Sequence, residues 1–193
     1  MLIFSMFPPL VFADAVAGKK KSEVCVVCHD IAREDKLLVP VLEGQPREFF
    51  IAQIAAFRTK LRTELNMDVM TRNLNTTDID DLADYFAAQE PARPPLHVDA
   101  KLAAAGAMKL NELHCSACHQ PTYAGQGAAA RLAGQKPKYT AWTLLMIGLG
   151  KRHHPAEAMP EIKSLTGEDI DHIAHALASM RSHSDVEQMR HDR

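Results

Sequence analysis

Four cysteines lie in two matching clusters, and each cluster ends in a histidine. Residues 25–29 read CVVCH, residues 115–119 read CSACH, and these two segments contain every cysteine of the chain. Thiols three residues apart share one side of a helical turn, so both can reach one porphyrin edge and form thioethers with its two vinyl groups. The histidine that follows is then placed to bind the iron. Each cluster therefore predicts one covalently attached haem.

Paired cysteines also serve other chemistry. Two C-x-x-C pairs can build a four-cysteine zinc site, work as redox dithiols or close two structural disulfides. None of these uses requires a histidine after the second cysteine, yet one is present both times. We therefore interpret the clusters as two haem c sites. Thioethers are assigned to Cys25, Cys28, Cys115 and Cys118, and iron ligation to His29 and His119.

A methionine in each half could bind the second side of its iron. A histidine alone leaves the iron open to small gases or peroxide, whereas an added thioether closes the site, raises the reduction potential and favours electron carriage. In the second half we expect Met159, which lies in the loop before the final helix. The first half offers Met67 and Met70, and the position 91 residues before Met159 is residue 68. This offset favours Met67, one residue away, and keeps Met70 as the alternative.

Other groups near these ligands have expected supporting roles. His153 and His154 are close to the Met159 position and could compete for the iron, but we expect a solvated pair in a loop. The free ring nitrogen of a ligating histidine normally donates to a backbone carbonyl, which fixes the ring and tunes the metal. The loops at Pro40 and Ala130, 90 positions apart, are expected to supply those carbonyls.

An internal repeat supports two equivalent sites. Cys25 and Cys115 are separated by 90 positions, and the same offset relates LEGQ at 42–45 to LAGQ at 132–135. Asp78 and Asp169, each followed by isoleucine, are 91 positions apart, so one residue has been inserted between. Self-similarity of this kind indicates tandem copies of one structural unit. We therefore predict an all-α fold built from two haem domains in tandem.

Each half is expected to contain three helices joined by loops. The first, over about 14–24 and 100–113, leads into the cysteines and is rich in helix formers. The second is expected to begin at Pro46 and near Pro137, since proline suits the first helical position. The third follows a capping signature at Asn75 or Thr166. Apolar stripes on these helices are expected to be buried; they comprise Phe50, Ile54, Phe57 and Leu61, then Ile79, Leu82 and Phe86, then Trp142, Leu145 and Leu149, and finally Ile170, Ile173 and Leu177.

Length and composition fit a globular protein of one or two domains. The 193 residues are 47% hydrophobic and carry a formal net charge of −2, which gives no sign of nucleic-acid binding. Prolines at 91, 94 and 95 disfavour a helix and favour a stiff linker. The expected divisions are a signal peptide at 1–13, an N-terminal domain at 14–90, a linker at 91–98, a C-terminal domain at 99–180 and a charged tail at 181–193.

The apolar start of the chain, MLIFSMFPPLV, is interpreted as an export signal, because haem is attached to such clusters outside the bacterial cytoplasm. Residues 11–13 (VFA) resemble a cleavage site that ends in a small residue. The run lacks Lys and Arg and contains two prolines, so we expect a signal that is truncated at its start; an apolar N-terminal arm is the alternative. The expected location is the periplasm.

Beyond the haem clusters, the chain resembles the diheme cytochromes c of the cytochrome c4 family over nearly all of its length after the leader. The resemblance is carried by PVLEGQ at 40–45, by FRTKLR at 57–62, by the methionine loop and by DIDDLADYF at 78–86. It implies two class I cytochrome c folds about a pseudo-twofold axis. It also implies His/Met ligation of both irons, with Met67 in the first half. Ala130 departs from the proline that the family usually has there.

The resemblance implies a periplasmic diheme cytochrome that carries electrons toward a terminal oxidase and catalyses no reaction. Expected partners are redox proteins such as a membrane cytochrome complex, a terminal oxidase or a dehydrogenase, with peripheral association to a membrane and no nucleic acid. One alternative is a dedicated electron-accepting subunit of a periplasmic dehydrogenase. Others are a diheme peroxidase, a thiosulfate-oxidising enzyme, or a redox or gas sensor, all of which need an open or exchangeable iron site.

Overall fold

The structure is a computed structural model of the chain and describes residues 15–30, 38–91, 98–154 and 160–180. The predicted signal peptide, most of the linker and the tail lie outside these ranges. Within them there is no β-strand, which confirms the all-α prediction, and no helix is long and apolar enough to cross a membrane. The helices are α1 (Ala15–His29), α2 (Arg47–Arg58), α3 (Leu65–Thr71), α4 (Thr76–Ala87), α5 (Ala100–Glu112), α6 (Ser116–His119), α7 (Pro137–Gly148), the 3-10 helix η2 (Pro160–Ser164) and α8 (Gly167–Ser179).

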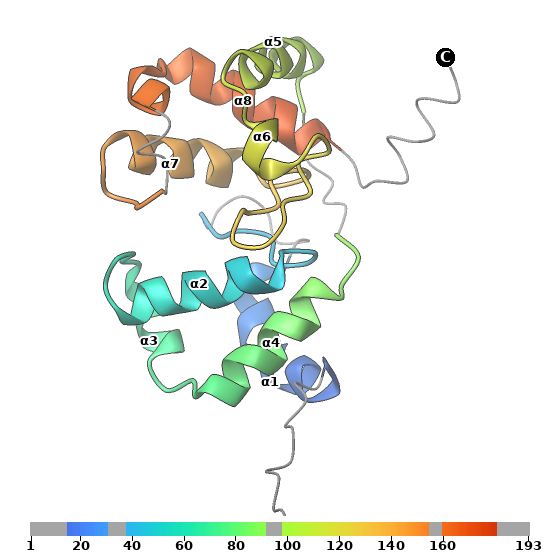
Figure 1. Cartoon of the computed structure of the whole chain (residues 1–193), viewed down its shortest axis with the longest axis vertical. Helices are drawn as coiled ribbons and strands as arrows, with labels where there is room; N and C mark the ends of the chain where they lie inside the picture. Colours follow the sequence, from blue (N-terminus) through green and yellow to red (C-terminus); the bar gives the residue numbers. More distant parts are fainter. Residues whose placement is uncertain (1–14, 31–37, 92–97, 155–159, 181–193) are drawn as a thin grey trace, which may run out of the picture.

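The helices form two lobes that follow the two halves of the repeat (Figure 1). Helices α1 to α4 make the first lobe, and α5 to α8 together with η2 make the second. In both lobes the first helix packs against the last, α1 against α4 and α5 against α8. The loops that follow the two cysteine clusters meet between the lobes, so the predicted haem clusters lie close to this junction.

A buried glycine lies at each crossing of the first and last helices. A Cβ atom on Gly18 would collide with the carbonyl oxygen of Asp81, and one on Gly106 would collide with that of His172. Asp81 and His172 are themselves 91 positions apart, the offset found for the last helices. Glycine therefore allows the two backbones to approach closely at equivalent points in both lobes.

The cysteine clusters join the first helix differently in the two lobes. Helix α1 runs without a break through its cluster to His29, whereas α5 ends at Glu112 and the short α6 carries the second cluster. Seven positions separate Gly18 from Cys25, but nine separate Gly106 from Cys115. The two extra residues are accommodated at a break where His114 adopts a left-handed backbone with φ 52°. The sequence prediction did not include this break.

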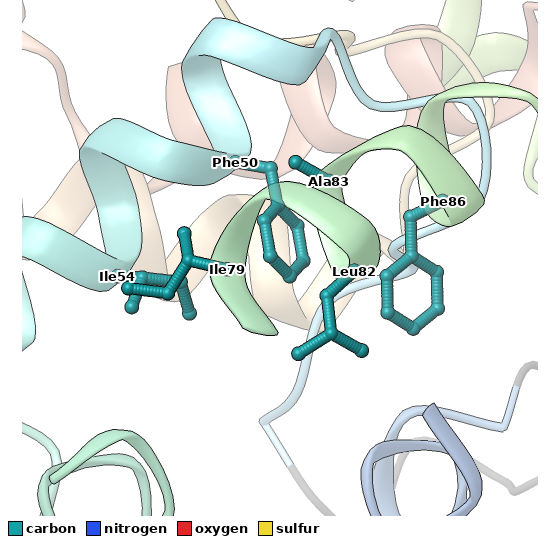
Figure 2. Close-up of a cluster of buried hydrophobic side chains, with 6 residues drawn as sticks. All are labelled: Phe50, Ile54, Ile79, Leu82, Ala83 and Phe86. Atoms are coloured by element: carbon teal, nitrogen blue, oxygen red, sulfur yellow. The ribbon is translucent and has the colours of Figure 1, made fainter. Parts of the chain in front are cut away.

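Each lobe has its own apolar core between its last helix and the helix or loops that precede it. In the first lobe, Phe50 and Ile54 of α2 interlock with residues of α4 (Figure 2), and the Phe50 and Phe86 rings stack with centroids 5.4 Å apart. Burying a large apolar side chain contributes roughly 1.5–3 kcal/mol. The second core is built from Leu110, Tyr123, Ala133, Ile173, Ala176 and Leu177.

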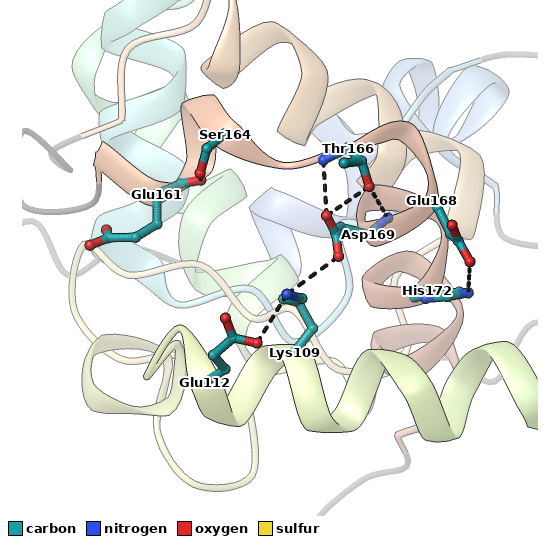
Figure 3. Close-up of polar contacts among 8 residues, drawn as sticks. All are labelled: Lys109, Glu112, Glu161, Ser164, Thr166, Glu168, Asp169 and His172. Carbon is teal, nitrogen blue, oxygen red and sulfur yellow. Dashed lines mark hydrogen bonds and ion pairs between the residues drawn. The ribbon is translucent and has the colours of Figure 1, made fainter.

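Both predicted helix caps are present as complete capping boxes. The Asn75 side chain accepts from the Asp78 amide, and the Thr166 side chain accepts from the Asp169 amide, while each aspartate bonds back to the cap backbone. In each lobe, a lysine of the first helix also forms an ion pair with the aspartate of the capping box. Lys21 lies 2.7 Å from Asp78, and Lys109 lies 3.4 Å from Asp169 and 2.9 Å from Glu112 (Figure 3). The cap thus also connects the first helix to the last.

Three residues of the predicted stripes are exposed. Leu61 follows the end of α2 at Arg58 and is 65% exposed, because the helical periodicity stops before it. Leu145 and Leu149 are 42% and 57% exposed on and after α7. Helix α2 also begins one residue after Pro46, which forms its N-cap, whereas Pro137 does occupy the first turn of α7. Helix α3 was not predicted.

Two buried glutamines join the lobes. Gln135 accepts from the Val41 amide at 2.9 Å and donates to the Val41 carbonyl at 3.2 Å. In the reverse direction, Gln45 accepts from the Arg131 amide at 3.1 Å and donates to the Arg131 carbonyl at 3.0 Å. Both glutamines and both backbone partners are related by the 90-residue offset. The junction therefore consists of two equivalent contacts running in opposite directions.

Candidate haem sites

The four cysteines are placed as two separate pairs. The structure contains no disulfide between them. Among the described residues, no three His, Cys, Asp or Glu side chains gather into a metal-binding group, so the pairs do not assemble a four-cysteine zinc site. The first thiol of each pair, Cys25 or Cys115, is partly buried, and burial raises its pKa. The second, Cys28 or Cys118, is exposed. The two thiols of each pair are therefore suited to form two thioethers to one porphyrin.

Both expected proximal histidines donate to the expected carbonyls. His29 is buried, and its Nδ1 lies 2.8 Å from the carbonyl oxygen of Pro40. His119 makes the equivalent bond, also of 2.8 Å, to Ala130. This confirms the prediction that these two loops supply the acceptors, even though one of them has alanine instead of proline. With Nδ1 protonated by this bond, Nε2 is left as the metal-binding nitrogen.

Burial sets the protonation of these two rings. Desolvation lowers the pKa of His29; the hydrogen bond to the Pro40 carbonyl opposes this shift, and the charges of Lys136 and Arg62 lower the pKa further. Desolvation also lowers the pKa of His119, although the Ala130 carbonyl opposes this shift. A neutral imidazole is the form that binds a metal. The lowered pKa of each ring therefore favours the neutral form that iron ligation requires.

The two candidate methionines of the first lobe lie in α3 with different surroundings. Met67 is partly buried and packs against the same apolar cluster as Cys25. Met70 is 45% exposed, although residues three apart share one side of a helix. The Thr71 hydroxyl donates to the Met67 carbonyl at 2.8 Å. The burial of Met67 agrees with the repeat offset. Met159 lies outside the described residues.

The adjacent histidines of the second lobe differ from each other. His153 is exposed, as expected for a solvated loop residue. His154 is partly buried, and its ring centroid lies 6.3 Å from that of His119. Burial, followed by the neighbouring His119, lowers the pKa of His154. Among the described residues, its buried Nδ1 has no hydrogen-bond partner. The prediction of a solvated pair is therefore correct for His153 and wrong for His154.

A basic cleft between the lobes was not predicted. Arg62 of the first lobe and Arg152 of the second both donate to the hydroxyl of Tyr139, at 3.2 and 3.0 Å. Burial alone would raise the pKa of Tyr139, but the two guanidinium groups outweigh it and lower that pKa to about 8. Two cations facing one cleft suit carboxylates, and haem carries two propionates. Only Arg62 was quoted in a motif, although Arg152 lies 90 positions later, at the offset that relates the two halves of the repeat.

Gln45 and Gln135 were also missed as functional residues. Both belong to the repeated L-x-G-Q segments, where the glycine has φ 70° or 72° and makes the turn that orients the glutamine. The sequence did contain a signal for these residues. Both repeats have a glutamine directly after the turn glycine, and a polar residue repeated at such a position is expected to have a hydrogen-bond partner. Its partner is on the other lobe, which a local pattern does not reveal.

Comparison with known proteins shows that the chain is similar to several cytochromes. No protein-family model matches the chain. A cytochrome c-552 of Acidithiobacillus ferridurans is 30% identical over 182 residues, covering 87% of this chain and 78% of that protein. A cytochrome c4 of Pseudomonas aeruginosa is 31% identical over 147 residues, covering 72% of this chain and 73% of that protein.

Solved structures give the same picture of the fold. The reduced recombinant cytochrome c4 from Pseudomonas stutzeri superposes with a TM-score of 0.77 at 25% identity, over 88% of this chain and 100% of that one. The thiosulfate dehydrogenase TsdBA from Marichromatium purpuratum superposes with a TM-score of 0.73 at 25% identity, over 86% of this chain but only 40% of that one.

Proposed function

The chain belongs to the cytochrome c4 family, and on that premise we propose that it carries electrons between redox proteins of the periplasm through two irons, each closed by a methionine. As a member of this family it is a diheme electron-transfer cytochrome with two class I cytochrome c domains and two covalently bound haem c groups. The proposal concerns the ligands, the location, the partners and the domain limits at 14–90 and 99–180.

Met67 is the observation that carries the closed-site proposal. It packs against the apolar cluster that also contacts Cys25, so a thioether lies on the apolar side of the first site. The haem supplies an iron that alternates between the ferrous and ferric states. Iron ligation by the Met67 thioether as well as by His29 would raise the reduction potential and exclude gases and peroxide. We propose Met159 for the same role opposite His119.

The remaining groups of the chain hold this arrangement still. The thioether cysteines fix each porphyrin to a helix, and the carbonyls of Pro40 and Ala130 hold the proximal rings in one orientation. Arg62 and Arg152 are placed to bind propionate carboxylates at the junction of the lobes. Retained ligands and buried side chains keep the change of structure between the two oxidation states small, as electron transfer requires.

Absorption spectroscopy and carbon monoxide binding test the closed-site proposal. In the holoprotein, the ferric methionine-to-iron band should account for both haems, and the reduced protein should bind carbon monoxide only slowly. Protein matured in the periplasm should gain the mass of two haems. Rapid carbon monoxide binding at either haem would show an open iron and contradict the carrier proposal.

A second candidate is the electron-accepting partner of a dehydrogenase. It is favoured by the similarity to TsdBA, which is itself a thiosulfate dehydrogenase. Stopped-flow reduction separates the two roles. A dedicated acceptor should be reduced much faster by its dehydrogenase with substrate than by a membrane cytochrome complex, and the reverse order supports general respiratory carriage.

A further inference from the structure

The carbonyl that holds each proximal histidine belongs to a peptide group that is also bound by the other lobe. The Pro40 carbonyl accepts from His29, and the amide on the same peptide plane, that of Val41, donates to the side chain of Gln135. The chain of bonds therefore runs from the imidazole of the first lobe, through one peptide, to a glutamine of the second lobe.

The same connection exists in the opposite direction. The Ala130 carbonyl accepts from His119, and the Arg131 amide on that peptide donates to Gln45 of the first lobe at 3.1 Å. Each glutamine also donates to the carbonyl of the residue whose amide it binds, so its amide group is held at both ends. Both glutamines are buried, at 5% and 6% exposure.

Hydrogen bonds through one peptide group strengthen each other. A peptide whose N–H is donated to an acceptor becomes more polarised, and its carbonyl oxygen then accepts more strongly. A stronger acceptor draws the Nδ1 proton of the imidazole and makes the opposite nitrogen a more basic ligand. A more basic ligand stabilises ferric over ferrous iron and so lowers the reduction potential.

We propose that Gln135 and Gln45 are positioning residues for the iron of the opposite lobe, so that each lobe sets the reduction potential of the other. Gln135 acts on the iron at His29 through the Pro40–Val41 peptide. Gln45 acts on the iron at His119 through the Ala130–Arg131 peptide. The inference rests on the proposed ligation of iron by His29 and His119. It gives a functional reason for the contact between the loops that hold these two histidines.

Gln135→Leu and Gln45→Leu test this crossed arrangement in the holoprotein. Leucine keeps most of the side-chain volume but removes the acceptor. We expect Gln135→Leu to raise the midpoint potential of the first haem more than that of the second, and Gln45→Leu to do the reverse. The haems are assigned by NMR through the Nδ1 protons of His29 and His119, whose resonances should shift in the same crossed pattern.

Two further variants keep the result interpretable. Gln135→Glu retains an acceptor for the Val41 amide and should return the first midpoint potential below that of Gln135→Leu. Gln126→Leu, at an exposed glutamine, should change neither potential. A larger shift at the haem of the substituted lobe, or equal shifts at both, would overturn the inference. Rapid carbon monoxide binding by the unsubstituted protein would overturn the carrier proposal alone.

Discussion

At the scale of single residues, environment separates side chains that the sequence presents as equals. Met67 and Met70 lie one helical turn apart, yet one contacts the apolar core and the other is 45% exposed. His153 and His154 are adjacent, yet only His154 approaches the proximal ring of its lobe. Residue type and spacing identify candidate iron ligands, and the burial of each side chain then distinguishes between the candidates.

Substitution of the two α3 methionines should give opposite results. Met67→Ala is expected to remove the methionine-to-iron band of the first haem and to lower its midpoint potential, because a thioether ligand raises it. Met70→Ala, at the exposed neighbour, is the matched control and should leave both properties unchanged. Redox titration followed by ferric absorption spectra measures both. Loss of the band in Met70→Ala with its retention in Met67→Ala would reverse the assignment.

The position of His154 predicts how the second haem responds to loss of Met159. With metal–nitrogen bonds of about 2 Å and about 1.1 Å from nitrogen to ring centre, two imidazoles on opposite sides of one metal have centroids about 6 Å apart. The rings of His119 and His154 are 6.3 Å apart. Met159→Ala should therefore stay low-spin, with His154 bound and a lowered midpoint potential.

Double variants decide whether His154 takes this place. Met159→Ala with His154→Ala should become high-spin at the second haem and bind carbon monoxide quickly. Met159→Ala with His153→Ala is the matched control and should behave like Met159→Ala alone. Electron paramagnetic resonance and carbon monoxide kinetics measure the difference. Identical behaviour of the single variant and the His154 double variant would contradict the expectation.

At the scale of elements, each lobe depends on a close crossing of its first and last helices. Gly18 and Gly106 leave no room for a side chain because a backbone carbonyl of the partner helix occupies that space. The capping boxes and their lysines fix the start of the last helix against the first. The cysteine cluster follows the first helix, so this crossing also positions the porphyrin attachment.

Alanine at a crossing glycine should destabilise its lobe. Gly18→Ala and Gly106→Ala are each expected to cost about 3 kcal/mol, the upper end for overpacking, because the obstructing atom is backbone and cannot rotate away. Gly167→Ala is the matched control, since nothing lies within 4 Å of its added Cβ, and should gain up to about 1 kcal/mol. Denaturant unfolding of the holoprotein measures the free energy of unfolding of all three variants. If Gly106→Ala is no less stable than Gly167→Ala, close packing at the crossing is refuted.

Much of this architecture was accessible from the sequence, because local patterns encode local structure. The capping boxes at Asn75 and Thr166 and the carbonyls of Pro40 and Ala130 follow from short motifs and the repeat offset. The break at His114 was not predicted, because helix-forming residues continue up to the cluster and only packing at Gly106 fixes the register.

The contacts between lobes could not be derived in this way. Periodicity assigns a buried face to a helix but does not say where the helix ends, which is why Leu61 was wrongly placed in the core. Likewise, Gln45 reaches a partner 86 positions away and Gln135 one that is 94 positions away. Only the three-dimensional arrangement of the two repeats brings those groups together.

At the scale of the whole molecule, the junction joins two similar lobes into one electron carrier. The glutamine contacts, the Lys136 bond to the Asp30 carbonyl and the cluster around Tyr139 all run between the halves. Most of these contacts involve buried polar groups, and such groups are costly to separate because each would lose its partner. We therefore expect the lobes to unfold together rather than one at a time.

Removing the glutamines should uncouple the lobes. Gln135→Leu leaves the buried amide and carbonyl of Val41 without their partner and is expected to cost about 2–4 kcal/mol. Gln45→Leu should cost less, because its contacts with Arg131 are only partly buried. With both substitutions, a single unfolding transition should split into two, one for each lobe. Calorimetry of the holoprotein measures this, with the exposed Gln126→Leu expected to stay within about 0.5 kcal/mol of the unsubstituted protein. One sharp transition in the double variant would show that the remaining contacts alone are enough to make the two lobes unfold as one unit.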